Sequence, residues 1–408
     1  MLHRPPNPFS SRRARVFAGL ALLLVVLSGC TRGTQGIFAT IEVEEATDTS
    51  NLPDAVSPTA LVYTDISDSG GRYLVLANGR IWQRDGVDGS SWSGLATPAS
   101  RRAKFMAGLD TDADGVSEEA YAVFDDGDGN GTLLYTLQAG GGGEGDLSWS
   151  AVSTILSAGE SITGMRGIGD RVLASTSSSS GDSLISWGTN GTAEEDHGTF
   201  ADGGLRDAAR ASGNQVVAVG RTTLVGVVAD ITSTTSPGKD VVTDSAAIVN
   251  AYGVGLIQDA SNNELFAVAT LDGDVYVQTP TDAAAPTSDA FVQASGSIDS
   301  RAFSDIARIE SVTGEERVAV SVFDPAGSLS EIADGYREAE VTGTGTGITL
   351  DFTSDIGDSY RGSDLARTGI GFMEYISGSD TLFALTVGTG LWRTTYPSTG
   401  ANPDWNWE

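Results

Sequence analysis

Short apolar runs separated by glycine turns recur along most of the chain from Thr59 onward. In a typical unit, an apolar strand is followed by a Gly or Asn-Gly turn and then by a strand that carries Trp or Tyr. Leu382 to Leu385, Gly388 to Gly390 and Leu391-Trp392 form the clearest unit. Apolar runs of this length bounded by glycine predict β-strands, and the short turns between them predict hairpins. Long helical periodicity is scarce, so the pattern predicts an all-β fold.

The second strand of each unit recurs at a nearly regular spacing. These strands begin near residues 73, 121, 172, 216, 265, 317 and 382, so consecutive units lie 44 to 65 residues apart. Repeats of about this size with four short strands each are typical of β-propeller blades. We therefore predict a β-propeller of about seven blades over residues 59–408. Two β-sandwich domains are the alternative architecture.

A propeller must close into a ring, and this requirement concerns both ends of the repeat region. We expect either Ile37 to Val43 or Ala60 to Tyr63 to supply an edge strand to the last blade, where Trp405-Asn406-Trp407 is also strand-like. Residues 45–58 are acidic, contain two prolines and lack apolar periodicity, as is typical of a linker.

The N-terminal segment has the features of an export signal. Four arginines precede Val16 to Leu27, an uncharged apolar run that is too short to span a bilayer. The sequence Leu27-Ser28-Gly29-Cys30 then resembles the lipobox of bacterial lipoproteins at all four positions. This resemblance implies removal of residues 1–29 and attachment of diacylglycerol and an N-acyl chain to Cys30. An ordinary signal peptide that happens to contain Cys is the alternative. We thus divide the chain into a signal peptide (1–29), a lipidated Cys with a short strand and an acidic linker (30–58), and the propeller (59–408).

The position after the lipidated cysteine bears on the final membrane. In well-known Gram-negative lipoproteins, absence of Asp at this position is compatible with sorting to the outer membrane, and here the residue is Thr31. The resemblance therefore implies a lipid anchor in the cell envelope, at the outer membrane or cell surface rather than the inner membrane.

Charge excludes one class of partner. The formal net charge is −30, and loss of residues 1–29, which hold four Arg and no acid, makes it −34. Such a field repels nucleic acid. With Cys30 lipidated, no cysteine remains for a disulfide, so the core must supply the stability, aided by any bound metal.

One stretch has the spacing of a calcium loop. Asp110, Asp112, Asp114, the carbonyl of Val116 and Glu118 occupy positions 1, 3, 5, 7 and 9, with Gly115 at position 6. This spacing curls oxygen ligands around one hard cation. Position 12 is Tyr121 rather than the Glu of an EF-hand. The stretch resembles FG-GAP repeats of integrin-like propellers, which implies a structural Ca²⁺ between the first two strands of a blade; a solvated acidic turn is the alternative.

A second, weaker loop follows. Asp126, Asp128 and Asn130 repeat positions 1, 3 and 5, but Leu134 stands at position 9 where a carboxylate is needed. Asp, Asn and Gly are also favoured by tight turns on conformational grounds. We therefore favour a turn without metal here.

Other residue types offer little catalytic chemistry. His197 is the only histidine left after signal removal, and its acidic surroundings are typical of a solvated loop. The seven tryptophans recur beside glycine turns, which predicts packing between neighbouring blades. We expect no catalytic residue set and favour a non-enzymatic binding or scaffolding role, as a monomer, for an envelope protein or glycan. A carbohydrate-active or quinone-dependent propeller enzyme is the alternative.

Overall fold

The computed structural model describes Leu52 and residues 56–408, with internal gaps. These gaps are 67–70, 87–90, 141–146, 153–154, 193, 201–203, 222–224, 237, 245–247, 249, 281–290, 296–301, 310–316, 324–332, 353–364, 366–367, 377–378 and 396–404. The signal peptide, Cys30, the strand at 37–43 and most of the linker therefore lie outside the described residues. Leu52–Glu408 forms one compact unit. Among the described helices, none has the length and apolar character needed to cross a membrane.

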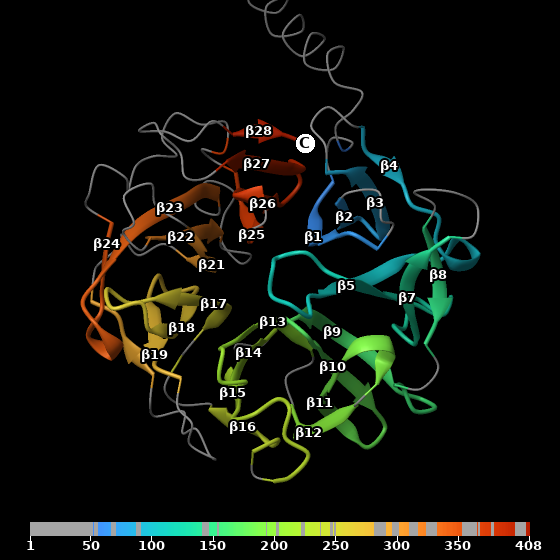
Figure 1. Ribbon diagram of the computed structural model, residues 1–408, viewed down its shortest axis with the longest axis horizontal. Coiled ribbons are helices and arrows are strands. Elements are labelled where there is room, and N and C mark those ends of the chain that lie inside the picture. Colours follow the sequence, from blue (N-terminus) through green and yellow to red (C-terminus); the bar gives the residue numbers. More distant parts are fainter. Residues whose placement is uncertain are drawn as a thin grey trace, which may run out of the picture. The chain divides into compact units, whose positions relative to one another are not determined.

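Seven four-stranded antiparallel sheets surround a common centre, so the fold is a seven-bladed β-propeller (Figure 1). Blade 1 holds β1 (Pro58–Thr64), β2 (Arg72–Ala77), β3 (Arg80–Asp85) and β4 (Ser93–Gly94); blade 2 holds β5 (Ala103–Leu109), β6 (Glu119–Phe124), β7 (Leu133–Ala139) and β8 (Leu147–Ala151). Blade 3 holds β9 (Ser161–Gly167), β10 (Val172–Ser178), β11 (Gly181–Trp187) and β12 (Glu195–Thr199); blade 4 holds β13 (Leu205–Arg210), β14 (Val216–Gly220), β15 (Val225–Val228) and β16 (Val241–Asp244).

The remaining three blades follow the same order. Blade 5 holds β17 (Ala251–Gln258), β18 (Glu264–Thr270), β19 (Val275–Gln278) and β20 (Val292–Gln293); blade 6 holds β21 (Phe303–Ile309), β22 (Arg317–Phe323), β23 (Ala333–Thr342) and β24 (Thr349–Asp351). Blade 7 holds β25 (Ile370–Ile376), β26 (Thr381–Thr386), β27 (Leu391–Thr395) and β28 (Asn406–Trp407). In the connections that the structure describes lie three short 3-10 helices, η1 (Pro98–Ser100), η2 (Thr189–Gly191) and η4 (Gly345–Gly347).

The second strand of each blade is the strand that the repeat spacing predicted. These strands begin within two residues of the predicted positions. β14, β18 and β26 are apolar along most of their length because neighbouring blades cover both of their faces. The turn after β2 has Asn78 and Gly79 at φ 50° and 79°, the left-handed conformation that a tight hairpin requires.

One apolar cluster fills each interface between successive blades, including the interface of blade 7 with blade 1. Trp187, which is fully buried, meets the Tyr121 ring edge-on at 5.8 Å between blades 2 and 3. Trp82, Trp92, Trp149, Trp392 and Trp405 also belong to these clusters, as predicted. Trp407 lies instead in the outermost strand, opposite Trp392. Since a buried aromatic or aliphatic side chain contributes about 1.5–3 kcal/mol, these interfaces hold the ring together.

A β-bulge occurs near the start of the first strand in all seven blades. The extra residue in each strand has no direct partner on the second strand. The bulged residues are Thr59, Lys104, Thr163, Arg206, Tyr252, Ser304 and Gly371. A bulge bends and twists its strand, and here it does so near the start of the first strand in every blade.

Glycine allows the first strands to approach one another closely. A Cβ atom added to Gly255 would lie 2.2 Å from the carbonyl oxygen of Ile306 in the next blade. The same atom on Gly167 would lie 2.1 Å from the carbonyl oxygen of Gly108. Real Cβ atoms do not approach backbone oxygens to this distance, so the inner ring depends on the absence of side chains at these positions.

The last blade is completed by the chain's own C-terminal strand. β28 pairs with β27, whereas Ala60 to Tyr63 pairs with β2 in blade 1. The expectation that Ala60 to Tyr63 closes the last blade is therefore wrong, because blade 7 already contains four strands. Described residues before β1 contact the last blade instead: the backbone N–H of Leu52 donates to the carbonyl of Glu408 at 2.8 Å, and the carbonyl of Val56 accepts the N–H of Gly390 at 3.1 Å.

A buried ion network crosses the same interface. The carboxylate of Glu408 pairs with Arg84 of blade 1 and Arg393 of blade 7. The side chains of Arg84 and Glu408 are only 6% and 4% exposed. The Arg84 guanidinium also lies over the rings of Tyr73 (5.5 Å) and Trp92 (5.2 Å). One carboxylate thus neutralises cations from the first and last blades.

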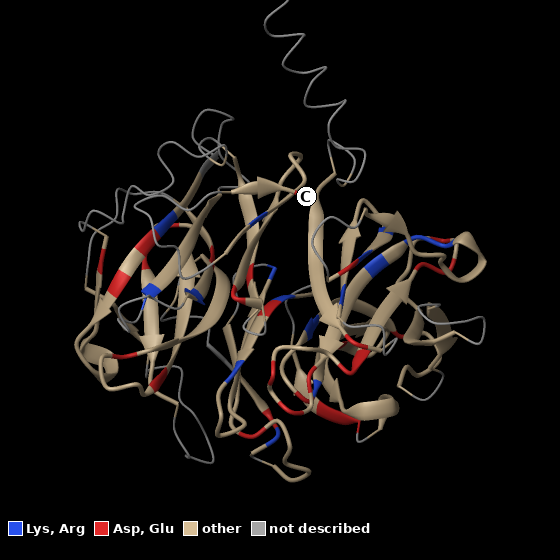
Figure 2. Cartoon of the chain, turned by 45° about the horizontal axis from the view of Figure 1, so that its top comes forward, with Lys and Arg blue, Asp and Glu red and all other residues tan. Residues whose placement is uncertain are grey.

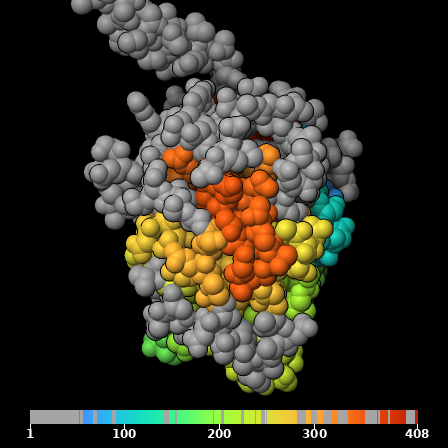
Figure 3. Space-filling model, turned by 90° about the vertical axis from the view of Figure 1, so that its left-hand side faces the viewer, coloured from blue at the N-terminus to red at the C-terminus, as the bar shows by residue number. Residues whose placement is uncertain are grey.

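The outer rim also carries a contact between blades. Ser295, after β20, forms a parallel bridge with Thr349 of β24, and its carbonyl accepts the N–H of Leu350 at 3.0 Å. Figure 3 shows this side of the molecule, where blade 5 (yellow) and blade 6 (orange) lie next to each other. The bridge satisfies backbone groups that a free sheet edge would leave unpaired.

Candidate functional site

The first strands of all seven blades line a cavity of about 780 Å³ at the centre of the propeller. A second cavity of about 230 Å³ adjoins it on the side of the bulges. Arg166 and Phe372 line both cavities and therefore stand at the boundary between them. Figure 2 shows acidic and basic residues on the strands around this centre. We call the larger cavity the channel and the smaller one the bulge cavity.

The predicted calcium loop lies at the end of the channel opposite the bulges. It connects β5 with β6, the first two strands of blade 2, and Asp110, Thr111 and Ala113 line the channel. Backbone bonds fix the loop to both neighbouring blades, since Asp110 donates its N–H to Gly169 (2.9 Å) and Ser117 donates to Tyr63 (2.7 Å). The loop is therefore held in place by blades 1 and 3.

The four carboxylates of this loop come together. Asp110, Asp112, Asp114 and Glu118 each offer one oxygen within 4.8 Å of the others. Desolvation and then the neighbouring carboxylates, Asp114 foremost, raise the pKa of Asp112. Clustered carboxylate oxygens are the donor set that a hard cation such as Ca²⁺ prefers, so these residues fit the predicted ligand.

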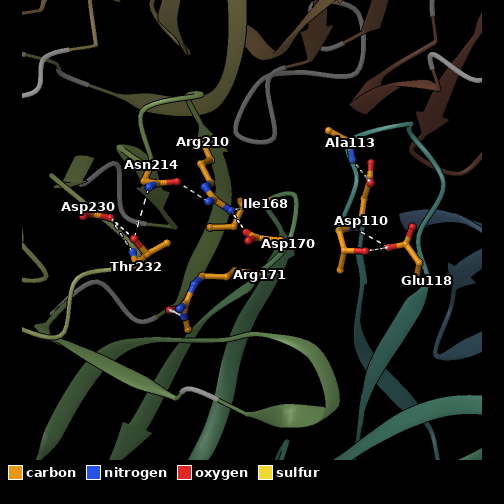
Figure 4. A network of polar contacts seen from close by, with 12 residues as sticks. Asp110, Ala113, Glu118, Ile168, Asp170, Arg171, Arg210, Asn214, Asp230 and Thr232 are labelled. Carbon is orange, nitrogen blue, oxygen red and sulfur yellow. Dashed lines mark hydrogen bonds and ion pairs between the residues drawn. The ribbon is translucent and has the colours of Figure 1, made fainter.

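Part of this carboxylate set binds the loop's own backbone. The carboxylate of Asp110 accepts the N–H groups of Ala113 (2.7 Å) and Gly115 (2.9 Å). The carboxylate of Glu118 accepts the N–H of Thr111 at 2.6 Å, and Val116 donates its N–H to Asp114 at 2.7 Å. Figure 4 shows Asp110, Ala113 and Glu118 on the right of the view. Gly115, at φ 85°, supplies the left-handed turn that the spacing requires.

A polar network continues around the same end of the channel. Arg210 forms an ion pair with Asp170, and donates to the carbonyl of Ile168 (3.3 Å) and to Asn214 (2.6 Å) (Figure 4). Asn214 in turn contacts Thr232 at 3.4 Å. This network joins the turns of blades 3 and 4, so the acidic loop borders an ordered polar surface.

The second acidic loop forms a self-capped turn. Asp126 accepts the N–H groups of Asp128 (2.9 Å) and Asn130 (3.2 Å) and the hydroxyl of Thr132 (3.2 Å). These bonds, the one from Asp128 first, lower the pKa of Asp126. These carboxylate oxygens thus hold the hairpin between β6 and β7.

Three acidic residues inside the centre escaped the sequence analysis. Asp207 and Asp305 are the residues directly after the bulges of β13 and β21, and each is at least nine-tenths buried. Each ties its blade to the next: Asp207 accepts the N–H of Val254 at 2.9 Å, and Asp305 accepts that of Met373 at 2.7 Å. Burial, and then the charge of Asp207, raises the pKa of Asp305 well above its usual value. The only sequence signal is a charged residue near the start of an otherwise apolar strand.

Glu374, the third of these acids, faces the channel itself. Its side chain is open to the channel yet surrounded by protein, and this burial raises its pKa to about 7, against the opposing effect of Arg166. Arg166 also donates to Asp207 at 3.3 Å. A carboxyl group that changes charge near neutrality therefore lies beside an arginine in the channel wall.

His197 is not the solvated loop residue that the sequence analysis predicted. It lies in β12, is fully buried, and bonds to Ser186 through Nε2 (2.8 Å) and to the carbonyl of Lys239 through Nδ1 (2.7 Å). Burial lowers its pKa and favours the neutral ring. Because a carbonyl only accepts, Nδ1 carries the proton and Nε2 accepts from the Ser186 hydroxyl. The acidic residues Glu195 and Asp196 made the segment resemble a loop. It is a strand, and in this strand the side chain of His197 is buried.

The sequence matches no protein-family model and no curated protein. Solved structures show the same fold at low identity. A structure of YCF48 from Cyanidioschyzon merolae superposes with a TM-score of 0.53 at 12% identity, covering 86% of this chain and 98% of that chain. YCF48 bound to D1 peptide gives 0.50 at 14% identity, covering 86% and 95%. BBS1N in complex with ARL6DN gives 0.51 at 10% identity, covering 86% and 99%. Similarity at this identity extends to the fold alone.

Proposed function

We propose that the protein is a non-enzymatic binding propeller of the cell envelope. The channel is the observation that supports this proposal. The first strands of the seven blades form it, and its polar groups Asp207 and Asp305 are held in place by hydrogen bonds from backbone N–H groups. Preformed concave sites with a few fixed polar groups are typical of ligand binding. The expected partner is an envelope protein or glycan that contacts one end of the channel.

The solved propellers accord with this role. YCF48 binds a D1 peptide, and BBS1N forms a complex with ARL6DN. Both use the fold of this chain to contact another polypeptide. Their sequences are too distant for their contact residues to be transferred, so the partner of this chain must be identified by experiment.

The anchor belongs to the same proposal. After signal removal, acyl chains on Cys30 would tether a monomeric propeller to the envelope, at the outer membrane or cell surface. More than one acyl chain is needed for stable anchoring. Lipid attachment at the lipobox Leu27-Ser28-Gly29-Cys30 would supply several acyl chains. Metabolic labelling with a clickable palmitate analogue tests this anchor. The label should appear on the wild-type protein and be lost, together with membrane association, in Cys30→Ser.

The loop at Asp110 to Glu118 would hold a structural Ca²⁺. Asp110, Asp112, Asp114 and Glu118 would supply carboxylate oxygens, and Val116 its carbonyl. The ion would neutralise a cluster of negative charge and stiffen the loop that blades 1 and 3 hold. Its role is to stabilise one end of the channel.

A carbohydrate-active enzyme is the second candidate, and Glu374 is the observation that favours it. A carboxyl group with a pKa of about 7 can donate a proton at neutral pH, as the general acid of a glycoside hydrolase does. Its partner in such a reaction would be another channel carboxylate such as Asp207.

One experiment separates the two candidates. The full chain, purified in non-ionic detergent, is screened on a glycan array and against chromogenic glycosides, together with Glu374→Gln. A binding propeller binds a glycan and releases no chromophore from any glycoside. Turnover by the wild type that Glu374→Gln abolishes would overturn the binding proposal and establish the enzyme.

A further inference from the structure

The bulge cavity has an unusual charge for this protein. Its wall contains Lys104, Arg166, Arg206 and Arg221 and, among the residues that the structure describes, no acidic one. The chain as a whole has 54 acidic and 24 basic residues. A cavity wall with four basic residues is therefore unusual for this protein. These cations come from strands and turns of blades 2, 3 and 4, and only the fold brings them together.

Most of these cations have no carboxylate partner among the residues that the structure describes. Arg166 alone forms an ion pair, with Asp207 on the channel side. Arg206 donates Nε to the carbonyl of Tyr252 at 2.9 Å, which leaves its two terminal nitrogens without a bond to any described residue. Lys104 contacts a backbone carbonyl, that of Gly129, and Arg221 contacts the Phe105 ring. The cavity wall is therefore positive, and the charges of Asp207 and Asp305, which act on Arg206 from outside this wall, offset only part of it.

The closeness of these cations to one another is electrostatically unfavourable. Burial, and after it the charge of Arg166, lowers the pKa of Arg206 to about 10. The same two causes, in the same order, lower the pKa of Arg221. Arg206 is half-buried and Arg221 is exposed, so water relieves part of their mutual repulsion and leaves the rest uncompensated. An anion in the cavity would supply this compensation.

Aromatic rings hold the guanidinium groups in defined planes. Arg206 lies 3.2 Å from the centroid of Tyr252 and 5.0 Å from that of Phe372. Arg166 lies 4.3 Å from Phe372, so this ring lies against both arginines. A guanidinium that stacks through its face keeps its edge free for hydrogen bonds in the plane. The edge of an arginine matches the two oxygens of a carboxylate or phosphate.

We infer that the bulge cavity is a binding site for a small organic oxyanion. The cavity volume of about 230 Å³ suits a compact molecule, with the oxyanion near Arg206 and Arg221. Phe105, Met106 and Leu76, which also line the cavity, would contact the apolar body of the ligand. This inference deepens the proposed binding function by naming the chemistry of one ligand, and it does not depend on which envelope partner is bound elsewhere.

Calorimetric titration with benzoate and with inorganic phosphate tests the site. The full chain in detergent is titrated at constant ionic strength, with chloride as the reference anion. We expect saturable binding of at least one of the two probes and none of chloride. Binding of benzoate alone indicates a carboxylate ligand with an apolar body, and binding of phosphate alone indicates a phosphate ester.

Variants distinguish the site from the general charge of the protein. Arg221→Gln should weaken binding about tenfold or more, the value of a charge-assisted hydrogen bond. Arg80→Gln, which removes one exposed cation outside the cavity, should bind as the wild type does. Arg206→Gln should show a larger loss, and Arg221→Gln remains the test if that variant does not fold.

Two outcomes would overturn the inference. The first is no saturable binding of either probe by the wild type, and the second is equal loss of affinity in Arg221→Gln and Arg80→Gln. Neither outcome affects the proposed function, which is measured separately by glycan and protein binding. Conversely, if the wild-type protein binds one of the anions but no envelope partner, the anion site is supported and the scaffolding role is not.

Discussion

Replacement of Glu408 by glutamine should destabilise the propeller at the junction of its first and last blades. Glutamine preserves the shape of the side chain but removes the charge that Arg84 and Arg393 share. Arg84 is 6% exposed on its side chain, so water cannot replace the lost partner, whereas Arg393 is 26% exposed and is partly solvated. Loss of one partner from a buried pair costs about 3–5 kcal/mol. Since only one of the two arginines is fully buried, we expect about 3 kcal/mol.

This loss should be measurable as a shift in the melting temperature. With an unfolding entropy of about 2.1 cal/mol/K per residue over roughly 350 residues, 3 kcal/mol corresponds to a decrease of about 4 °C. Differential scanning calorimetry at pH 7 measures this shift. Asp85→Asn is the matched control, because it breaks a pair with Arg72 in which the carboxylate is 58% exposed. Such surface pairs contribute about 0–1 kcal/mol. If both variants melt at the same temperature, the network at Glu408 does not hold the ring closed.

Three further predictions concern other parts of the propeller. Chelation of calcium should lower the melting temperature of the wild type, and Asp112→Ala should remove this response; identical melts with and without chelator would contradict the calcium proposal. Gly255→Ala should destabilise by about 1–3 kcal/mol, because its Cβ would lie 2.2 Å from the Ile306 carbonyl oxygen, whereas Gly94→Ala, with nothing within 4 Å, should have little effect in denaturant titrations. The pKa of Glu374 is raised to about 7, so the folded protein binds more protons than the unfolded chain and stability falls as pH rises from about 4.5 to 7. Glu374→Gln should lose this decline, and parallel curves for the two proteins would show that Glu374 does not titrate in this range.

The sequence predicted the blades well because a blade is a local object. Each central strand, such as β14 or β26, is apolar along most of its length and bounded by glycine turns, and both features lie within a few residues of each other. The clustering of the carboxylates between Asp110 and Glu118 could be predicted for the same reason, since this stretch is continuous.

The sequence could not predict groups that only the closed ring brings together. Glu408 meets Arg84 across more than 300 residues of chain, and Arg206 meets Phe372 from three blades away. His197 was misassigned because its neighbours are acidic, although alternation along β12 buries its side chain. The expectation for Ala60 to Tyr63 failed for a related reason: Trp405-Asn406-Trp407 is strand-like in the sequence, but the sequence does not show that Asn406 and Trp407 alone complete the last blade.

The seven bulges separate two requirements that a β-strand usually combines. A regular strand residue must suit both its neighbour across the sheet and the side of the sheet that it faces. The bulged residues have no such partner, and they range from glycine and serine to lysine, arginine and tyrosine while the sheets around them keep the same register. The ring of bulges is thus a set of seven positions that differ in chemistry while the seven blades share one fold. Selection for a new ligand could act on these positions one at a time.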